Sequence, residues 1–235
     1  MTATTDEIMT VAAARELRDG VLCFVGIGLP SAAANLARAT HAPNCVLIYE
    51  SGTIGAKPTR LPLSIGDGEL ADTADALVSV PEIFNYWLQA GRVDVGFLGA
   101  AQIDKYGRLN TTVVGDYAEP RVRLPGAGGA PEIAASAKEV IMVLRHNTRA
   151  FVEELSFVTS VVKGPRVVLT DLGVLRSDDT GELVLVAVHP NVTVQQVKAA
   201  TGWDLRVSDN VTVTEPPTER ELAVLRALHQ GSVRA

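Results

Sequence analysis

One carboxylate stands at a position where it could react with a substrate. Glu50 follows the apolar run 45–49 and precedes Ser51 and Gly52, two small residues that leave room beside it. A carboxylate can act as a nucleophile when it is partly desolvated and when hydrogen-bond donors face the oxyanion that it creates. Glu50 could instead be a strand-end glutamate that only accepts hydrogen bonds from the backbone of its loop. The pattern Tyr49-Glu50-Ser51-Gly52 makes Glu50 a candidate for covalent catalysis.

A glycine-rich loop could supply the donors. Segment 126–131 reads Gly-Ala-Gly-Gly-Ala-Pro and leads into a predicted helix that begins at Pro131. Free amides at a helix N-terminus favour negative charge, and glycines such as Gly128 and Gly129 let a substrate approach the backbone. A flexible loop before a capped helix would have the same composition. Asn110 could donate an amide N–H in the same pocket, or it could only satisfy a turn.

Basic residues are candidates for holding a second carboxylate of a substrate. Arg121 and Arg123 lie two positions apart, so on a strand they would face the same side and could bind a carboxylate through paired hydrogen bonds. Lys57 lies in a turn-rich loop and could act in the same way. Each residue could equally belong to a solvated face or to a salt bridge between subunits.

The turn Gly26-Ile27-Gly28 indicates a second kind of site. It lies between an apolar run and a predicted helix, and Glu50 ends the following strand, as in a dinucleotide-binding fingerprint. The third glycine of that pattern is missing, because Ser31 stands in its place and Pro30 enters the helix. A tight turn that binds no ligand explains the same residues. A nicotinamide-dependent oxidoreductase therefore stays an alternative.

The elements that must position these residues alternate between strands and helices. Continuous apolar runs bounded by turns predict buried strands, and apolar residues at helical spacing predict helices. The predicted strands include 21–25, 45–49, 93–98, 140–144, 167–170, 173–175 and 183–188, and the predicted helices include 6–19, 31–40, 81–91, 193–200 and 218–228. We therefore expect one α/β domain over 1–235, with a mostly parallel open sheet and helices on both faces. Turns at the carboxyl edge of such a sheet carry most binding sites.

Composition argues against several classes of function. The net charge is -6 and Lys and Arg do not cluster, so the charge that binds a nucleic-acid backbone is missing. No apolar run approaches the roughly 20 residues that span a bilayer, and the start of the chain is polar and acidic, so we expect no membrane contact and a cytoplasmic protein. Cys23 and Cys45 lie in apolar runs and are expected to be small buried side chains. The histidines are scattered, so we expect no metal.

Several multi-residue motifs follow one another in a fixed order along the chain. They are the segments 25–31, 48–52, 63–69, 97–102, 110–112, 115–117 and 123–134. Together these segments resemble the β subunit of family I CoA-transferases, in the branch that includes glutaconate and 3-oxoadipate CoA-transferases. The resemblance implies the NagB/RpiA-like α/β fold of these subunits. It also implies that Glu50, in the strand-end motif Glu-Ser-Gly, is the nucleophile, with Ser51 and Gly52 beside the substrate.

The resemblance implies a ping-pong reaction through covalent states of Glu50. Glu50 attacks the thioester of a donor such as succinyl-CoA and forms an acyl-glutamyl anhydride. The CoA thiolate then forms a glutamyl-CoA thioester, and an acceptor acid repeats these steps in reverse. The acceptor is expected to be a dicarboxylate such as 3-oxoadipate. No cofactor is implied, because coenzyme A is itself a substrate.

The resemblance also assigns further site residues and a partner. Asn110, Gly128 and Gly129 match positions expected to hold the oxyanion or the substrate carboxylate, and Gly26 and Gly28 match the turn assigned to CoA. Members of the family act as α/β pairs that are often doubled. We therefore expect an α subunit, an α2β2 assembly, and no activity of this chain alone.

One segment departs from the pattern of this branch. Its members carry a long glycine-rich excursion where this chain has only 161–166. If the excursion shapes the acid pocket, the preferred acid differs here, whereas the role of Glu50 is unaffected. An acyl-CoA hydrolase of the same fold is a further alternative, because water attacking the acyl-glutamyl intermediate would release the free acid.

Overall fold

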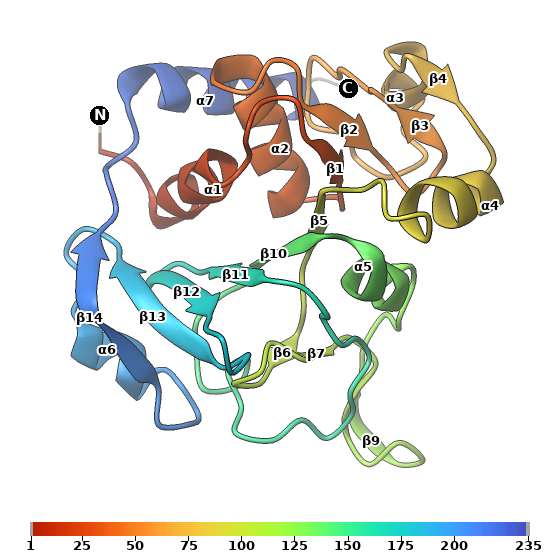
Figure 1. Cartoon of the computed structure of the whole chain (residues 1–235). Coiled ribbons are helices and arrows are strands. Elements are labelled where there is room, and N and C mark those ends of the chain that lie inside the picture. Colours follow the sequence, from red (N-terminus) through yellow and green to blue (C-terminus); the bar gives the residue numbers. More distant parts are fainter. Residues whose placement is uncertain (1, 234–235) are drawn as a thin grey trace. The chain divides into compact units, whose positions relative to one another are not determined.

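The computed structural model describes residues 2–233, which form two compact units (Figure 1). The described part of the first unit spans 2–98, 136–138 and 217–233. The second unit spans 99–135 and 139–216. Both units contain strands and helices, as the apolar runs of the sequence predict. That the chain forms one domain over 1–235 stays a prediction.

In the first unit, helices and strands alternate from the N-terminus. The helices are α1 (Thr5–Arg15), α2 (Leu29–Thr40), α3 (Gly68–Asp72), α4 (Val80–Glu82), the π-helical η1 (Ile83–Leu88) and α7 (Glu219–Val233). The strands are β1 (Leu22–Phe24), β2 (Val46–Ile48), β3 (Thr53–Ile54), β4 (Ala76–Leu77) and β5 (Val95–Leu98). They lie in the order β5-β1-β2-β3-β4, with β5, β1 and β2 parallel and β3 and β4 antiparallel. The carboxyl ends of β1 and β2 therefore meet at one edge.

Burial and helix caps explain why the first unit folds in this way. The side chains of Cys23, Phe24 and Leu47 are at most 1% exposed, as expected for strands covered by helices. A capping box between Thr4 and Glu7 begins α1, where it satisfies amides that have no partner within the helix. Helices α1, α2 and α7 pack on one another. Ion pairs of Arg15 with Glu221 and of Arg226 with Glu7 hold α7 to α1.

The second unit contains a sheet and two hairpins. The sheet strands are β10 (Glu139–Val143), β11 (Arg166–Leu169), β12 (Gly173–Ser177), β13 (Leu183–Val188) and β14 (Arg206–Val213), in that order. Pairs β10/β11 and β13/β14 are parallel, and β11/β12 and β12/β13 are antiparallel. The hairpins are β6 (Gln102–Ile103) with β7 (Leu109–Asn110) and β8 (Val113–Gly115) with β9 (Pro120–Arg123). Helices α5 (Ala130–Ser136) and α6 (Val194–Ala199) complete the elements.

The predicted α/β class with an open sheet is confirmed, but the pairing of its strands is more mixed than expected. Strands β3, β4 and β12 run antiparallel to their neighbours. Apolar runs do not reveal strand direction, because a strand that is buried on both faces has the same composition in either sense. The polar strand β14 was not predicted, since its residues are largely exposed and show no continuous apolar run.

The short segment 161–166 is held in place by its last residue. The guanidinium of Arg166 donates to the carbonyls of Val162, Gly164 and Gly181. Gly107 and Gly181 leave space for this side chain, because a Cβ on either glycine would lie within 3 Å of it. The connection is therefore a packed turn in the second unit.

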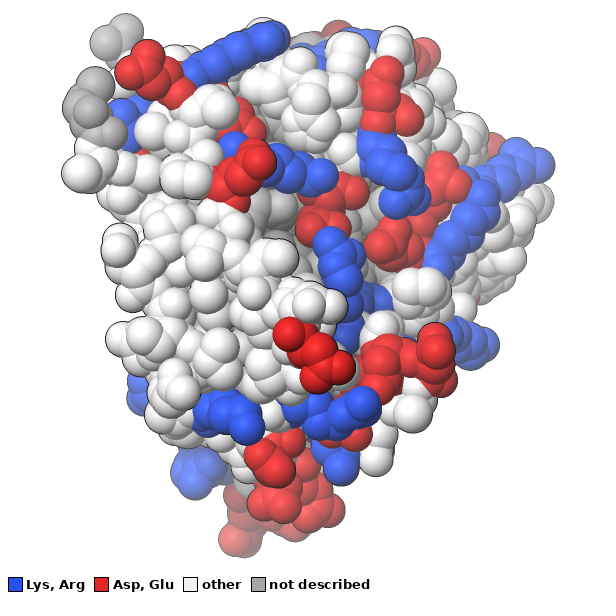
Figure 2. All heavy atoms as spheres, turned by 60° about the vertical axis from the view of Figure 1, so that its left-hand side comes forward, with Lys and Arg blue, Asp and Glu red and all other residues white. Residues whose placement is uncertain are grey.

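The remaining expectations from composition concern cysteines, membranes and charge. Cys23 and Cys45 are buried, and burial raises the pKa of the Cys45 thiol to about 12 and that of Cys23 well above its usual range. Across residues 2–233, every helix is too short or too polar to cross a bilayer. No group of three or more His, Cys, Asp or Glu side chains in this range could hold a metal ion. Figure 2 shows a face on which acidic and basic side chains are interspersed.

Two buried histidines make the second unit sensitive to acid. His146 is 6% exposed, its ring nitrogens lie 3.2 and 2.9 Å from the hydroxyls of Thr170 and Thr201, and it stacks on Phe151. Burial lowers the pKa of His146 to about 4, and it also lowers the pKa of His189, which contacts the Thr170 carbonyl. Both imidazoles are therefore neutral in the folded protein at pH 7.

Lowering the pH from 7 to 5.5 is expected to destabilise the protein. The unfolded chain takes up a proton near pH 6.5 while folded His146 does not, so stability is full above pH 6.5 and falls towards pH 4. His146 alone should cost about 1 kcal/mol over this interval. Urea unfolding at both pH values measures the change. His146→Gln should flatten the pH dependence; an equal slope in the wild type and the variant would contradict this origin.

Candidate active site

Glu50 lies in a tight turn at the end of β2. The amide of Gly52 donates to the Tyr49 carbonyl at 3.0 Å, and the amide of Tyr49 donates to the Thr53 carbonyl at 3.1 Å. These bonds close a hairpin between β2 and β3 and fix the backbone on both sides of Glu50. The Glu50 side chain is half-buried and has no hydrogen bond or ion pair with any residue in 2–233. A glutamate that only served its own loop would accept such bonds, so this geometry favours a role towards a ligand.

Gly52 makes this turn possible. Its φ is 104°, and a Cβ built on it would lie 2.0 Å from the carbonyl oxygen of Val78. The two backbones are joined by a hydrogen bond of 2.9 Å from the Val78 amide to the Gly52 carbonyl. Between Glu50 and Gly52, the Ser51 hydroxyl is buried without a partner among the described residues. The small residues at this turn therefore allow Val78, which follows β4, to pack against it.

A buried polar cluster anchors the residue before Glu50. Tyr49 is fully buried, and its hydroxyl lies 3.1 Å from both the Ser31 hydroxyl and the amide nitrogen of Asn35 on α2. Burial raises the pKa of Tyr49, so the phenol stays neutral. Ser31 occupies the position where a dinucleotide site keeps a third glycine, and here its side chain ties helix to strand. The oxidoreductase alternative loses its structural basis.

The turn 26–28 lies at the same edge as Glu50. Phe24 of β1 pairs with Ile48 of β2, so the residues that follow each strand emerge side by side. Gly28 has a φ of 85° and caps α2 without a side-chain hydrogen bond. A Cβ on Gly28 would meet no atom within 4 Å, so the turn has an open side. The first unit thus brings Gly26, Gly28 and the Glu50 turn to one edge.

In the second unit, the glycine loop runs from β9 to α5. The amides of Leu124 and Gly126 donate to the carbonyls of Thr112 and Thr111 at 3.0 and 2.8 Å, which fixes the start of the loop. Gly128 has a φ of 51° and an open side where a Cβ would meet no atom within 4 Å. Within 2–233, the amides of Gly128 and Gly129 make no hydrogen bond. Their predicted role as donors to an oxyanion stays a prediction.

The bonds of Asn110 match one of the two roles considered for it, that of satisfying a turn. It is fully buried, and its Nδ2 donates to the Gln102 side chain at 3.0 Å and to the Val113 carbonyl at 2.6 Å. Its Oδ1 accepts from the amides of Thr112 and Val113. Both N–H groups are used within the second unit, and a donor role of Asn110 towards substrate stays a prediction. Asn110 satisfies the turn that leads to β8, and it fixes Gln102.

The three basic candidates also differ in the contacts that they make. Lys57 forms an ion pair with Asp75, so its charge is compensated within the first unit. Arg123 donates to the Tyr117 carbonyl at 3.1 Å and lies over the Tyr117 ring. Arg121 makes no such contact and lines a cavity beside Gln102.

A β-bulge explains why the two arginines differ. Val114 pairs with Val122 and Gly115 pairs with Pro120, which leaves Arg121 as the extra residue on β9. A bulge breaks the alternation of faces, so spacing of two positions no longer implies a shared side. The spacing of Arg121 and Arg123 therefore no longer supports a shared carboxylate-binding face, and their role stays a prediction. In the sequence, the bulge has no signal apart from Gly115, whose φ is 94°.

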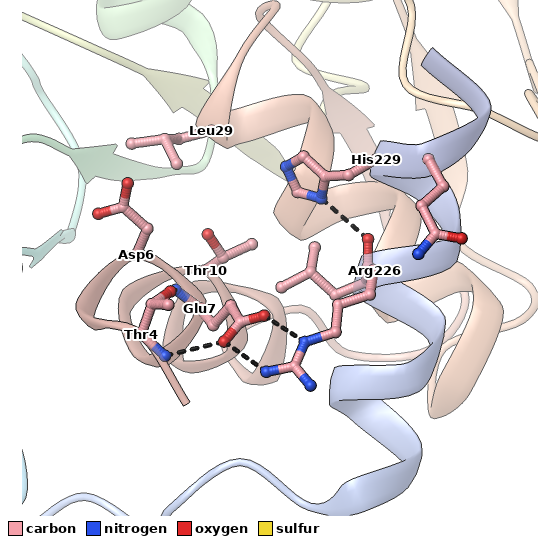
Figure 3. A pocket seen from close by; sticks show the side chains of 9 residues that line it. Thr4, Asp6, Glu7, Thr10, Leu29, Arg226 and His229 are labelled. Carbon is pink, nitrogen blue, oxygen red and sulfur yellow. Dashed lines mark hydrogen bonds and ion pairs between the residues drawn. The ribbon is translucent and has the colours of Figure 1, made fainter. Parts of the chain in front are cut away.

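A separate hollow of about 340 Å³ lies in the first unit among α1, α2 and α7 (Figure 3). The Glu7 carboxylate and the Arg226 guanidinium line the hollow and form an ion pair. His229, which also lines it, contacts the Leu225 carbonyl at 2.9 Å. The ion pair holds the pKa of Glu7 near 2, so Glu7 is charged and compensated. The ion pair joins α7 to α1 beside the hollow.

Gly52→Ala is expected to destabilise the protein more than Gly20→Ala. Both glycines have positive φ, but Gly20 has open space where Gly52 has the Val78 carbonyl. The conformational penalty alone is about 1 kcal/mol, and the clash adds roughly 2 kcal/mol or more. Thermal unfolding measures the difference, at about 3 °C per kcal/mol for a chain of this size. Equal shifts for the two variants would show that the contact with Val78 is relaxed.

Comparisons with known proteins bear on the family to which this chain belongs. Residues 6–200 match the coenzyme A transferase family. A 3-oxoadipate CoA-transferase subunit of Pseudomonas knackmussii is 57% identical over 98% of this chain and 95% of its own length. The cholesterol ring-cleaving hydrolase IpdB subunit of Mycobacterium tuberculosis is 28% identical over 96% of this chain and 94% of its own.

The fold is also shared with a solved structure. Glutaconate coenzyme A-transferase from Acidaminococcus fermentans superposes with a TM-score of 0.91 at 30% identity, over 98% of this chain and 96% of that one. Family match, sequence identity and fold lead to one conclusion. The chain belongs to the coenzyme A transferase family, which confirms the resemblance, the enzyme class and the α/β fold expected from its sequence.

Proposed function

We propose that this chain carries the nucleophile of a CoA-transferase that moves CoA from a donor such as succinyl-CoA to a dicarboxylic acid such as 3-oxoadipate. The observation that carries the proposal is the unpartnered carboxylate of Glu50 at the carboxyl edge of β2. A carboxylate that is bonded to its own protein loses nucleophilicity, because those bonds stabilise its charge. The choice of acid rests on the relative that is 57% identical.

The proposed reaction begins with attack of a Glu50 carboxylate oxygen on the thioester carbonyl. The carbon–sulfur bond breaks, CoA leaves as its thiolate, and Glu50 is left as a mixed anhydride with the acyl group. The thiolate then attacks the glutamyl carbonyl, which releases the first acid as a carboxylate and leaves a glutamyl-CoA thioester. The second acid attacks this thioester, and the same steps in reverse give the new acyl-CoA. The free energy of the thioester is conserved throughout.

Each attack creates an oxyanion that needs donors. We assign this role in the first unit to the buried Ser51 hydroxyl, which has no hydrogen-bond partner among the described residues. For Gly128 and Gly129, whose amides make no hydrogen bond within 2–233, the same role is proposed from the family resemblance. Preorganised donors of this kind stabilise the developing charge without rearrangement. The turn containing Gly26 and Gly28 is assigned to CoA, because its open side leaves the backbone accessible.

The proposed enzyme includes a second chain. The 3-oxoadipate CoA-transferase relative is itself named as a subunit, and the family resemblance implies an α subunit. We therefore propose an α2β2 assembly in the cytoplasm in which this chain alone is inactive. No cofactor takes part in the proposed steps, because every bond that breaks or forms belongs to Glu50, CoA or the two acids.

An acyl-CoA hydrolase is the second candidate, because the same nucleophile could serve it. Water that attacked the acyl-glutamyl anhydride in place of the CoA thiolate would release the free acid and leave CoA as the thiol. The two reactions differ in their products: a transferase needs an acceptor acid to consume acyl-CoA, whereas a hydrolase releases free CoA without one. Assay of free CoA with and without 3-oxoadipate separates them.

The nucleophile is tested by the intact mass of this chain after incubation of the α/β complex with succinyl-CoA. The wild-type chain is expected to gain a CoA-sized mass, because the glutamyl-CoA thioester accumulates when no acceptor is present. Glu50→Gln should gain none and should lose at least about 10³-fold in kcat. The exposed Glu153→Gln is the control and should behave as wild type. An adduct on Glu50→Gln, or none on wild type that still binds CoA, would overturn the proposed role.

A further inference from the structure

The second unit contains a groove that holds two arginines without carboxylate partners. Its volume is about 480 Å³, and its lining includes Gln102, Arg121, Arg149 and the valines 114, 122 and 152. We refer to it as the arginine groove. Alanine and valine side chains form much of its wall, and its polar side chains are the two arginines, Gln102 and Thr148.

Neither guanidinium in the arginine groove is compensated. The side chains of Arg121 and Arg149 make no hydrogen bond, ion pair or ring contact with any residue in 2–233. Other arginines of the chain are paired, for example Arg60 with Asp67 and Arg206 with Asp178. Both side chains are exposed, so their guanidinium groups keep all their donors for an anion that binds in the groove.

The backbones that present these arginines are fixed. The Arg149 amide donates to the Asn147 side chain at 3.1 Å, and its carbonyl accepts from Gln102 at 3.1 Å. Gln102 is itself held by Asn110 at 3.0 Å. Asn110 therefore acts as a positioning residue for the groove through Gln102. On the other side, the bulge in β9 places Arg121 into the groove beside Val122.

Acidic residues limit where an anion could bind. A neighbouring hollow of about 420 Å³ shares Gln102 and Arg121 with the groove and is lined by Asp116, Glu119 and Glu154. None of these carboxylates forms an ion pair with Arg121 among the described residues. Their charge disfavours an anion in the neighbouring hollow and favours the side of the groove that Arg149 lines, where no acidic residue is present.

We propose that the arginine groove binds the anionic end of a substrate between Arg121 and Arg149, with the valines covering the methylene groups next to it. The group recognised is a carboxylate or phosphate at the end of an aliphatic chain. It could come from the distal carboxylate of a dicarboxylic acid or from a phosphate of CoA. This inference rests on the proposed function and names the groups that would select its substrate.

Calorimetric titration of the α/β complex tests the groove without turnover. The probes are adipate, the monocarboxylate hexanoate, CoA and 3′-dephospho-CoA, and the variants are Arg121→Gln and Arg149→Gln. If the groove binds a distal carboxylate, each variant weakens adipate binding about 10-fold or more and changes hexanoate binding less than about twofold. If it binds the 3′-phosphate, the variants weaken CoA binding and leave 3′-dephospho-CoA unchanged.

Controls separate charge from folding and from catalysis. Arg92→Gln removes an exposed arginine that stacks on Trp87 in the first unit, and it should leave all four affinities unchanged. Arg121→Lys and Arg149→Lys keep the charge and should recover part of the lost affinity. Unchanged affinities for adipate and CoA in both glutamine variants, or equal losses for adipate and hexanoate, would overturn the proposal. Binding that behaves as expected while no adduct forms on Glu50 would contradict only the proposed function.

Discussion

The candidate site depends on the close approach of two backbones at Gly52. The Val78 carbonyl occupies the space where any side chain at Gly52 would begin, and the hydrogen bond between these residues holds the turn after β2. Because that turn is closed from both sides, Glu50 cannot be drawn into the bonds of a relaxed loop. The absence of a side chain at Gly52 thereby holds the turn in which the Glu50 carboxylate has no partner among the described residues.

The residues around Glu50 divide the tasks of holding and reacting. Tyr49 is fully buried and bonded to Ser31 and Asn35, so the strand end is anchored by a neutral polar cluster. Glu50 is half-buried and unbonded. A fully buried, unpartnered carboxylate would be too costly to keep ionised, and a fully solvated one would be a weak nucleophile. Glu50, partly buried and directly after the anchored Tyr49, lies between these two limits.

The sequence predicted those features that depend on neighbours along the chain. Apolar runs located β1, β2, β5 and β10, and Glu50 became the candidate nucleophile because a charged residue that ends such a run and precedes small residues is unusual. Contacts between distant residues were not predictable. The pairing of Lys57 with Asp75, the bulge at Arg121 and the bonds that occupy Asn110 all depend on how strands and loops meet. Arg149 was missed because no motif surrounds it.

Asn110 shows how a motif residue can serve a site without touching a substrate. Its position in the family motif suggested a donor, yet both of its N–H groups bond within the second unit, one of them to Gln102. Gln102 in turn fixes the backbone of Arg149. A change at Asn110 would therefore act through the placement of Arg149 and of the turn before β8. Fold alone does not determine chemistry, so residues that hold other side chains in place can matter as much for a reaction as those that touch the substrate.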